Sequence, residues 1–144
     1  MKSEPGTYAL IFQNHSTGKL QIGHLGPIEL VPGYYIYVGS AFGPGGVRAR
    51  ISRHWRVDKP KNWHIDYLRE FVRPMCAWAS YEPERLEHQW AQHFYEMRGI
   101  AAIQGFGCSD CKCYSHFSHA VVVPEVVGSG LGNSIYCYAF DKFV

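Results

Sequence analysis

Arginines that directly follow a glycine-rich loop are the first residues whose types and spacing could do chemistry. The loop covers residues 39–46 with the sequence GSAFGPGG, and the next ten residues contain Arg48, Arg50, Arg53 and Arg56. Backbone N–H groups of such a loop can approach an anion closely, and a helix that begins there attracts negative charge. The pattern suits a phosphate group. A loop that only makes a turn is the alternative.

Positive charge is concentrated in this region, although the whole chain carries a formal net charge of only +2. Between residues 48 and 61 the single acidic residue is Asp58, and the basic residues are Arg48, Arg50, Arg53, Arg56, Lys59 and Lys61. A local basic patch on a nearly neutral protein favours a polyanionic partner. A solvated helix face is the other interpretation.

One carboxylate falls within an apolar helix face. Glutamate and proline at residues 82 and 83 predict the start of a long helix that runs to about residue 98. Glu87 lies inside its apolar stripe, which consists of Leu86, Trp90, Phe94 and Met97. A buried carboxylate is costly unless it is compensated. Glu87 therefore pairs with an arginine such as Arg50, donates a hydrogen bond when protonated, or binds a metal ion.

Cysteines and a histidine near the end of the chain could bind a second metal. Four zinc ligands could come from Cys108, Cys111, Cys113 and His116. The spacing lacks the second CxxC of a paired-knuckle site. We favour reduced cysteines and a histidine that pack a loop, with zinc as the alternative.

The bulk properties indicate one cytoplasmic domain. A chain of 144 residues is long enough to bury a core, and we expect a single domain over residues 1–144. The first predicted strand begins by Tyr8, which leaves no room for a secretory signal peptide, so we expect cytoplasmic residence and reduced thiols. No apolar run approaches the roughly 20 residues that span a bilayer, so we expect no membrane partner.

An α+β fold with a small antiparallel sheet flanked by helices is expected to position these residues. The predicted strands cover residues 7–12, 19–22, 34–39 and 75–81, and the predicted helices cover residues 46–57, 63–68 and 82–98. Asn62 is expected to cap the short middle helix. The segment 19–22 is expected to return beside the first strand in a meander. The core spans about residues 6–100, and residues 105–144 add the loop with cysteines and an additional C-terminal strand pair at 119–123 and 134–140.

The helix over residues 46–57 has its apolar stripe at Val47 and Ile51, with Arg50 and His54 along one edge. Arg50 is therefore expected to lie against the sheet. A half-buried arginine needs an anionic partner, which is either a protein carboxylate or a ligand phosphate.

In this order along the chain, four segments resemble signatures of the GIY-YIG nuclease superfamily: Gly6-Thr7-Tyr8, Tyr37-Val38-Gly39, Val47-x-x-Arg50-Ile51-x-x-His54 and Glu87-x-x-Trp90. Threonine stands where the first signature usually has isoleucine. Three further segments are similar to the small stand-alone Uri-type branch: residues 39–46, Trp63-His64-Ile65-Asp66-Tyr67, and Phe106-Gly107-x-Ser109-Asp110-Cys111-x-Cys113-x-Ser115-His116. The signatures cover about the first 100 residues.

The resemblance implies a metal-dependent endonuclease that hydrolyses phosphodiester bonds in DNA. Glu87 would hold Mg²⁺ or Mn²⁺, and Arg50 would stabilise the charge on the scissile phosphate. Tyr8 and Tyr37 would position the attacking water or help to deprotonate it, and His54 would assist them. Because free tyrosine titrates at about 10, Tyr8 acts as a base only if its phenolate is stabilised, and otherwise it orients the water.

Other residues are expected to contact the nucleic acid or to leave room for it. The expected contacts are Ser40, Arg48, Arg53, Arg56, Lys59 and Lys61. Gly39 is expected to leave room for the substrate backbone, and loop amides are a second expectation for phosphate capture. The family's late polar residue, often asparagine, has only Ser109 and Asp110 as candidates. The chain could be a monomer or a homodimer.

Two other classes of function stay open. A non-catalytic nucleic-acid-binding module of the same fold would use the basic patch, and its binding would fall steeply with salt without cleavage. A small zinc-stabilised interaction domain would use the cysteine loop, and metal analysis of the purified protein would test it.

Overall fold

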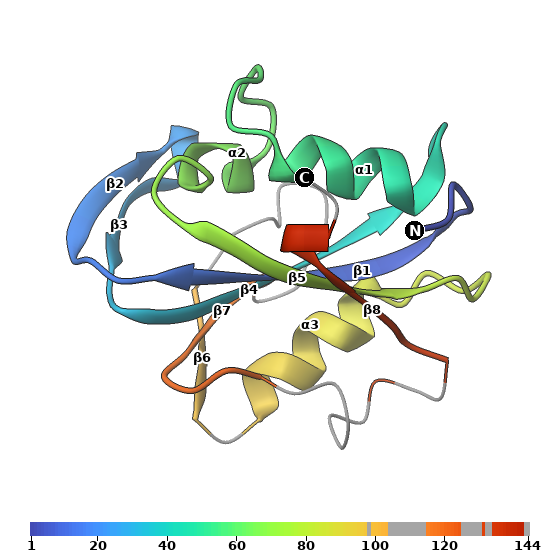
Figure 1. The fold of residues 1–144 in the computed structure, drawn as a ribbon. Helices are drawn as coiled ribbons and strands as arrows, with labels where there is room; N and C mark the ends of the chain where they lie inside the picture. The colour runs from blue at the N-terminus through green and yellow to red at the C-terminus, as the bar shows by residue number, and fades with distance from the viewer. Residues whose placement is uncertain (98, 104–114, 125–130, 132–133, 143–144) are drawn as a thin grey trace.

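An antiparallel sheet of six strands separates two layers of helices (Figure 1). The computed structural model describes residues 1–97, 99–103, 115–124, 131 and 134–142. Across the sheet the strands follow the order β6 (Ile100–Ala102), β7 (Phe117–Ala120), β4 (Gly33–Ala41), β1 (Gly6–Asn14), β5 (Arg73–Ser80) and β8 (Tyr136–Ala139). The predicted α+β class is confirmed.

The central strand β1 is buried on both faces. Tyr8, Leu10 and Phe12 pack on the side of α1 (Gly46–Trp55), whereas Ala9 and Ile11 pack on the side of α3 (Glu87–Glu96). A strand without a polar face cannot lie at a solvated edge, so its sequence fits the position between β4 and β5.

The predicted meander is wrong in its second step. The strands β2 (Gly18–Ile22) and β3 (Gly26–Leu30) pair with each other in a separate two-stranded sheet, with the short 3₁₀ helix η1 (Gly23–Leu25) between them. The buried Asn14 amide joins the two ends of the segment that contains β2 and β3, because its Nδ2 donates to the carbonyls of Ser16 at 2.7 Å and Val31 at 2.8 Å. The hairpin therefore closes at its base, and β4 pairs with β1.

The helix α3 begins five residues later than predicted. Leu86 precedes it, and the Leu86 N–H donates to the Thr7 hydroxyl at 3.1 Å while its carbonyl accepts from the Trp90 N–H. Glu87 is consequently the first residue of α3 instead of a residue in the second turn. At that end its side chain is 20% exposed.

The short helix α2 (His64–Leu68) is present, but Asn62 does not cap it. Trp63 precedes the helix, and the Asp66 carboxylate accepts the backbone N–H groups of Asn62 at 2.8 Å and Trp63 at 3.0 Å. An acidic side chain in the first turn can satisfy N–H groups at a helix start as well as a cap residue can.

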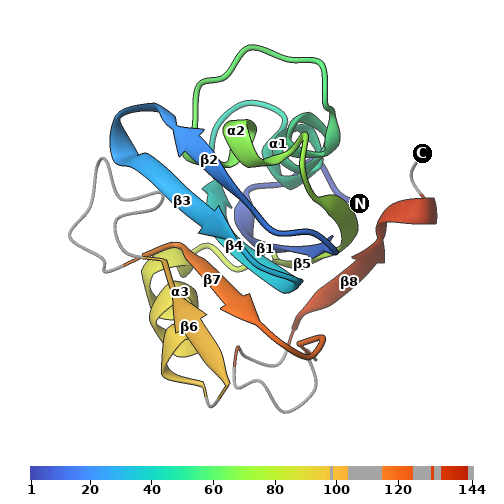
Figure 2. The ribbon, with the colours of Figure 1, turned by 90° about the vertical axis from the view of Figure 1, so that its left-hand side faces the viewer.

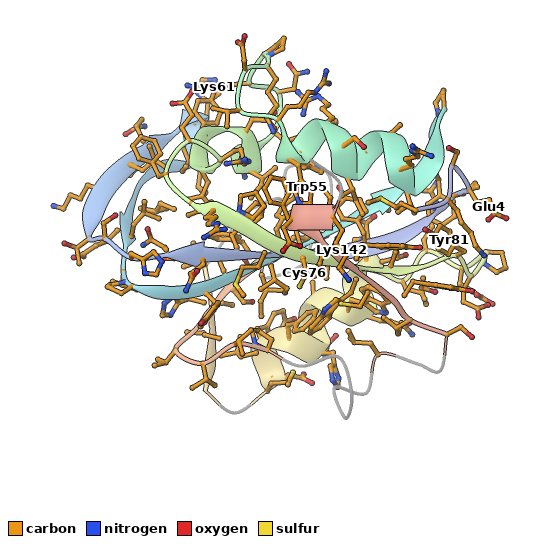
Figure 3. All side chains as sticks on the ribbon, in the orientation of Figure 1. Glu4, Trp55, Lys61, Cys76, Tyr81 and Lys142 are labelled. Atoms are coloured by element: carbon orange, nitrogen blue, oxygen red, sulfur yellow. The ribbon has the colours of Figure 1, made fainter. Side chains whose placement is uncertain are left out.

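The two predicted C-terminal strands exist, but they do not pair with each other. β7 extends the β4 side of the sheet and β8 extends the β5 side. Valines 121–123 lie outside β7 and are exposed. After β8, the turn η2 (Phe140–Lys142) covers the end of α1, and the centroids of the Phe140 and Trp55 rings lie 5.1 Å apart. Figure 3 labels Trp55 and Lys142 at this place. Among the described helices, none combines the length and the apolar composition that crossing a membrane requires.

Candidate active site

A cavity of about 440 Å³ lies at the end of β4, with walls that come from both helical layers. Four predicted catalytic residues line it, namely Tyr8, Tyr37, Arg50 and Glu87. The pairing of β4 with β7 stops at Tyr37 and Phe117. Beyond that point Gly39 and Ser40 belong to the cavity wall.

Tyr8 is buried against Gly39 and hydrogen-bonds to His54. Its hydroxyl lies 2.7 Å from His54 Nε2, and the residue is 1% exposed. Gly39 is its partner across the strands, and a Cβ there would meet the Tyr8 Cζ at 2.6 Å. Gly39 therefore leaves room for the Tyr8 ring, where we expected room for the substrate.

The pKa of Tyr8 is raised well above its usual value, chiefly by burial and next by Tyr37. Arg50 acts in the opposite direction, because its guanidinium lies close enough to favour the phenolate. Burial outweighs this effect. Tyr8 is therefore a neutral hydroxyl at neutral pH, which suits orientation of a water molecule better than proton abstraction.

His54 lies behind the cavity wall. Burial, with a smaller effect of Lys59, lowers the pKa of His54 to about 3, so the imidazole is neutral at pH 7. Its Nδ1 is buried and has no hydrogen-bond partner in the part of the chain that the structure describes. A proton on Nε2 would point to the Tyr8 oxygen and would leave no unpaired N–H inside the protein, so this tautomer is favoured.

Arg50 carries a positive charge into the cavity. Its Nη1 donates to the Ser40 carbonyl at 3.2 Å, and its guanidinium lies 4.7 Å from the Trp63 ring centroid. Within the described residues no carboxylate comes within 4.0 Å of it, so the ion pair with Glu87 that we considered is not formed. The remaining guanidinium N–H groups can take an external anion.

Glu87 faces three polar neighbours at the start of α3. Ser40 Oγ donates to Oε1 at 3.2 Å, and His88 Nε2 lies 3.7 Å from the same oxygen. His116 Nδ1 lies 3.9 Å from Oε2 and 3.3 Å from the Val38 carbonyl. The carboxylate is thus held in place while its side chain keeps access to the cavity.

The donor set fits a magnesium or manganese ion. Mg²⁺ keeps several waters and commonly takes one or two protein carboxylates together with substrate phosphates. Glu87 offers one such carboxylate at the cavity wall. The described ranges contain no group of three or more His, Cys, Asp or Glu residues that could hold a metal, so a closed, all-protein site is not present there.

The expected nucleic-acid contacts divide into two groups. Arg48 and Arg56 are exposed on α1 or directly after it, and Ser40 lines the cavity. Lys61 has an exposed ion pair with Glu70 at 3.7 Å.

Arg53 and Lys59 are turned inward. Asp66 accepts two bonds from the Arg53 guanidinium, at 3.1 and 3.2 Å, and the Lys59 ammonium lies 3.5 Å from it with its side chain 2% exposed. The expected surface role of Lys59 is corrected, because its charge is used inside the protein.

The glycine loop does not present free amides at the start of α1. The N–H groups of Val47 and Arg48 donate to the carbonyls of Glu4 at 2.9 Å and Lys2 at 3.1 Å. These two amides are therefore not free for a phosphate, and phosphate capture by the other amides of the loop stays a prediction. The loop instead orients the helix, and Arg50 reaches the cavity from it.

Three of the four proposed zinc ligands, Cys108, Cys111 and Cys113, lie outside the described residues, as do Ser109 and Asp110. The fourth, His116, is buried at 5% exposure and lines the cavity beside Glu87. Because His116 follows three cysteines in the sequence, the sequence indicated a zinc ligand or a residue that packs a loop.

Sequence reasoning also missed part of the cavity wall: Gly23, His24, Asn62, Trp63, His64, Tyr67 and Arg85. The Trp63–Tyr67 motif is recognisable in the sequence, but its position in the fold depends on the η1 turn and on Asp66. Arg85 comes from the segment that we expected to be helical, and it lies 4.6 Å from the Phe42 ring.

Comparison with protein families gives one match. The family described as a domain of unknown function, DUF123, matches residues 7–129. No curated protein and no solved structure matches the chain.

Proposed function

The chain belongs to the DUF123 family, and we propose that this member is a divalent-metal-dependent endonuclease that hydrolyses phosphodiester bonds in DNA. The resemblance of the sequence to GIY-YIG nucleases of the Uri-type branch also supports this function. The observation that carries it is the meeting of Tyr8, Tyr37, Arg50 and Glu87 at one cavity.

The chemistry of these groups suits a phosphodiester. Arg50 is a partly buried cation with no carboxylate within 4.0 Å among the described residues, so a phosphate is the anion that would neutralise it. A fixed guanidinium fork binds two phosphate oxygens and stabilises the charge that develops on them. Glu87 would hold Mg²⁺ or Mn²⁺, and that ion would supply Lewis-acid stabilisation of the phosphate.

The two tyrosines would place the attacking water. Tyr8 presents a neutral hydroxyl that His54 holds from behind at 2.7 Å. Tyr37 lies on the same face of the sheet, and its ring meets the His54 ring edge-on at 5.6 Å. His54 is thus a positioning residue for both tyrosines. His116 supports the Glu87 carboxylate from the side of β7.

Nicking of plasmid DNA and of branched DNA in Mg²⁺ or Mn²⁺ tests the proposal. Glu87→Ala and Arg50→Ala should each reduce the rate by roughly 100-fold or more, because each removes charge stabilisation at the phosphate. EDTA should abolish cleavage by the wild-type protein.

Matched controls separate this effect from general damage. Glu84→Ala and Arg73→Ala remove the same charges at exposed positions outside the cavity and should leave the rate within about twofold. Cleavage that survives in both Glu87→Ala and Arg50→Ala would contradict the mechanism.

One observation favours a second candidate, a nucleic-acid-binding module without catalysis. Glu87 is the only carboxylate among the described residues that line the cavity. A module of this kind would bind DNA with an affinity that falls steeply as salt increases, and no substrate would be cleaved in either metal.

A further inference from the structure

The Trp63–Tyr67 motif forms a wall of the cavity that the proposed chemistry leaves without a role. This wall consists of Gly23, His24, Asn62, Trp63, His64 and Tyr67, and we call it the α2 wall. Its residues come from η1, from α2 and from the segment before α2. Figure 2 shows α2 beside β2, which belongs to the separate two-stranded sheet.

A buried carboxylate fixes the α2 wall in place. Asp66 has a fully buried side chain. Its carboxylate accepts hydrogen bonds from the Arg53 guanidinium of α1 and from the backbone N–H groups of Asn62 and Trp63. On the other side, Tyr67 packs over Gly23, where a Cβ would meet its hydroxyl at 3.4 Å. The rings of the wall are therefore held in position before any ligand binds.

The composition of the α2 wall differs from that of the phosphate side. It carries two aromatic rings, two imidazoles and one carboxamide, and none of its residues is acidic. The Trp63 ring already has the Arg50 and Arg53 guanidinium groups at 4.7 and 4.3 Å from its centroid. Tyr67 is therefore the ring on which a base would stack, and imidazole and amide groups can hydrogen-bond to base edges. Trp63, His64 and Tyr67 are only partly buried, so parts of their side chains are accessible.

The α2 wall is joined to the phosphate side through Arg50. The Arg50 guanidinium lies 4.7 Å from the Trp63 ring centroid and also lines the cavity. A phosphate held by Arg50 is thus next to the wall. The volume of about 440 Å³ is within the range of about 300–1,000 Å³ that small-ligand sites occupy.

We infer that the α2 wall is a nucleobase subsite, which takes the base of a nucleotide next to the phosphate that Arg50 binds. The inference rests on the proposed function for the identity of that phosphate. A base inside a continuous duplex is stacked and paired, and it must leave the stack to enter such a cavity. The preferred substrate therefore has an unpaired nucleotide at the scissile phosphate.

Two single-stranded probes of equal charge test the subsite. The first is a 12-mer of thymidylate, and the second is a 12-mer of abasic tetrahydrofuran units with the same phosphates. The full-length Glu87→Gln variant is used in EDTA so that neither probe is cut. We expect it to bind the thymidylate probe about tenfold more tightly, because a base can stack on the wall and an abasic unit cannot.

Variants in the wall should act on one probe only. Tyr67→Ala and His64→Ala, each in the Glu87→Gln background, should remove most of the difference by weakening thymidylate binding while abasic binding stays within twofold. Tyr67→Phe should keep it, because the ring is retained. Phe71→Ala removes an aromatic side chain that is 52% exposed outside the cavity and should change neither affinity.

Equal binding of the two probes, an equal loss for both in the wall variants, or no binding of either probe would overturn the subsite. Failure of the proposed function gives a different result. If the wild-type protein cleaves no DNA but keeps the base-dependent difference, the endonuclease assignment fails and the subsite stands. If it cleaves DNA without that difference, only the subsite fails.

Discussion

The position of the Tyr8 hydroxyl, a candidate catalytic group, depends on the absence of a side chain at Gly39. Tyr8 is 1% exposed and is held by His54 on one side and by the β4 backbone on the other. A glycine across the strand pair permits this because it has no Cβ to occupy the place of the ring. The position of the hydroxyl is therefore set by two residues that themselves need no contact with substrate.

Gly39→Ala should displace Tyr8 and reduce catalysis more than binding. The new Cβ would meet the Tyr8 Cζ at 2.6 Å, and the buried ring has little room to move. We expect the nicking rate to fall by about 100-fold, as misplacement of a reacting group by about 1 Å can do. Overpacking should also lower the free energy of unfolding by about 1–3 kcal/mol.

Gly18→Ala is the matched control for that substitution, because a Cβ at Gly18 has nothing within 4 Å. It should leave both quantities nearly unchanged. DNA affinity should change less than threefold in either variant. A Gly39→Ala protein with the nicking rate of the wild type would show that the position of Tyr8 does not matter.

At the scale of elements, Asp66 joins three segments that the sequence separates. It accepts Arg53 from α1, lies 3.5 Å from Lys59 in the connecting loop, and satisfies the N–H groups at the start of α2. Burial lowers the pKa of Lys59 to about 8 even beside this carboxylate. The hydrogen bonds to Asp66 outweigh its own burial and lower its pKa.

Asp66→Asn should destabilise the protein because it removes the carboxylate that pairs with Arg53 and with the buried Lys59. Breaking a buried ion pair from one side costs about 3–5 kcal/mol. Urea unfolding at pH 7 measures the change. Glu70→Gln removes an exposed pair with Lys61 and should cost less than about 1 kcal/mol. Equal losses in the two variants would show that the Asp66 network adds no stability beyond a surface pair.

This network also shows why the basic patch was only partly predictable. Counting charges between residues 48 and 61 finds Asp58, whereas the carboxylate that neutralises Arg53 and Lys59 is Asp66, beyond the end of the patch. Helix periodicity placed Arg50 correctly toward the sheet, since that placement depends only on neighbours in the same helix. The partner of Arg53 depends on how a loop folds back, and no local pattern specifies it.

For the whole molecule, the sequence predicted the elements better than their pairing. Apolar runs identified β1, β4 and β5, and their burial agrees with that prediction. The meander was wrong because the choice between β2 and β4 as the partner of β1 depends on Asn14 and the closed hairpin. The ordered motifs predicted the four catalytic candidates that line the cavity, but His116 reaches it only because β7 pairs with β4.

His54 should make the stability of the whole molecule depend on pH. Its folded pKa of about 3 is below the unfolded value of about 6.5, so protons bind preferentially to the unfolded chain as pH falls. Stability is therefore complete above about pH 6.5 and is lost progressively toward pH 3, at up to about 1.4 kcal/mol per pH unit. Asp66, whose pKa is also lowered, acts mainly below its unfolded value and hence below most of this range.

Urea unfolding at pH 7 and pH 4.5 should differ by about 2–3 kcal/mol for the wild-type protein if His54 dominates. His54→Gln should lose most of the difference, although it lowers the stability at pH 7 by breaking the bond to Tyr8. His24→Gln, at an exposed position, should keep the difference. Burial also lowers the pKa of His64, which accounts for any smaller dependence of stability on pH that remains in His54→Gln. An unchanged slope in that variant would mean that His54 accepts a proton as readily in the folded protein as in the unfolded chain, and its role as a neutral support for Tyr8 would then be wrong.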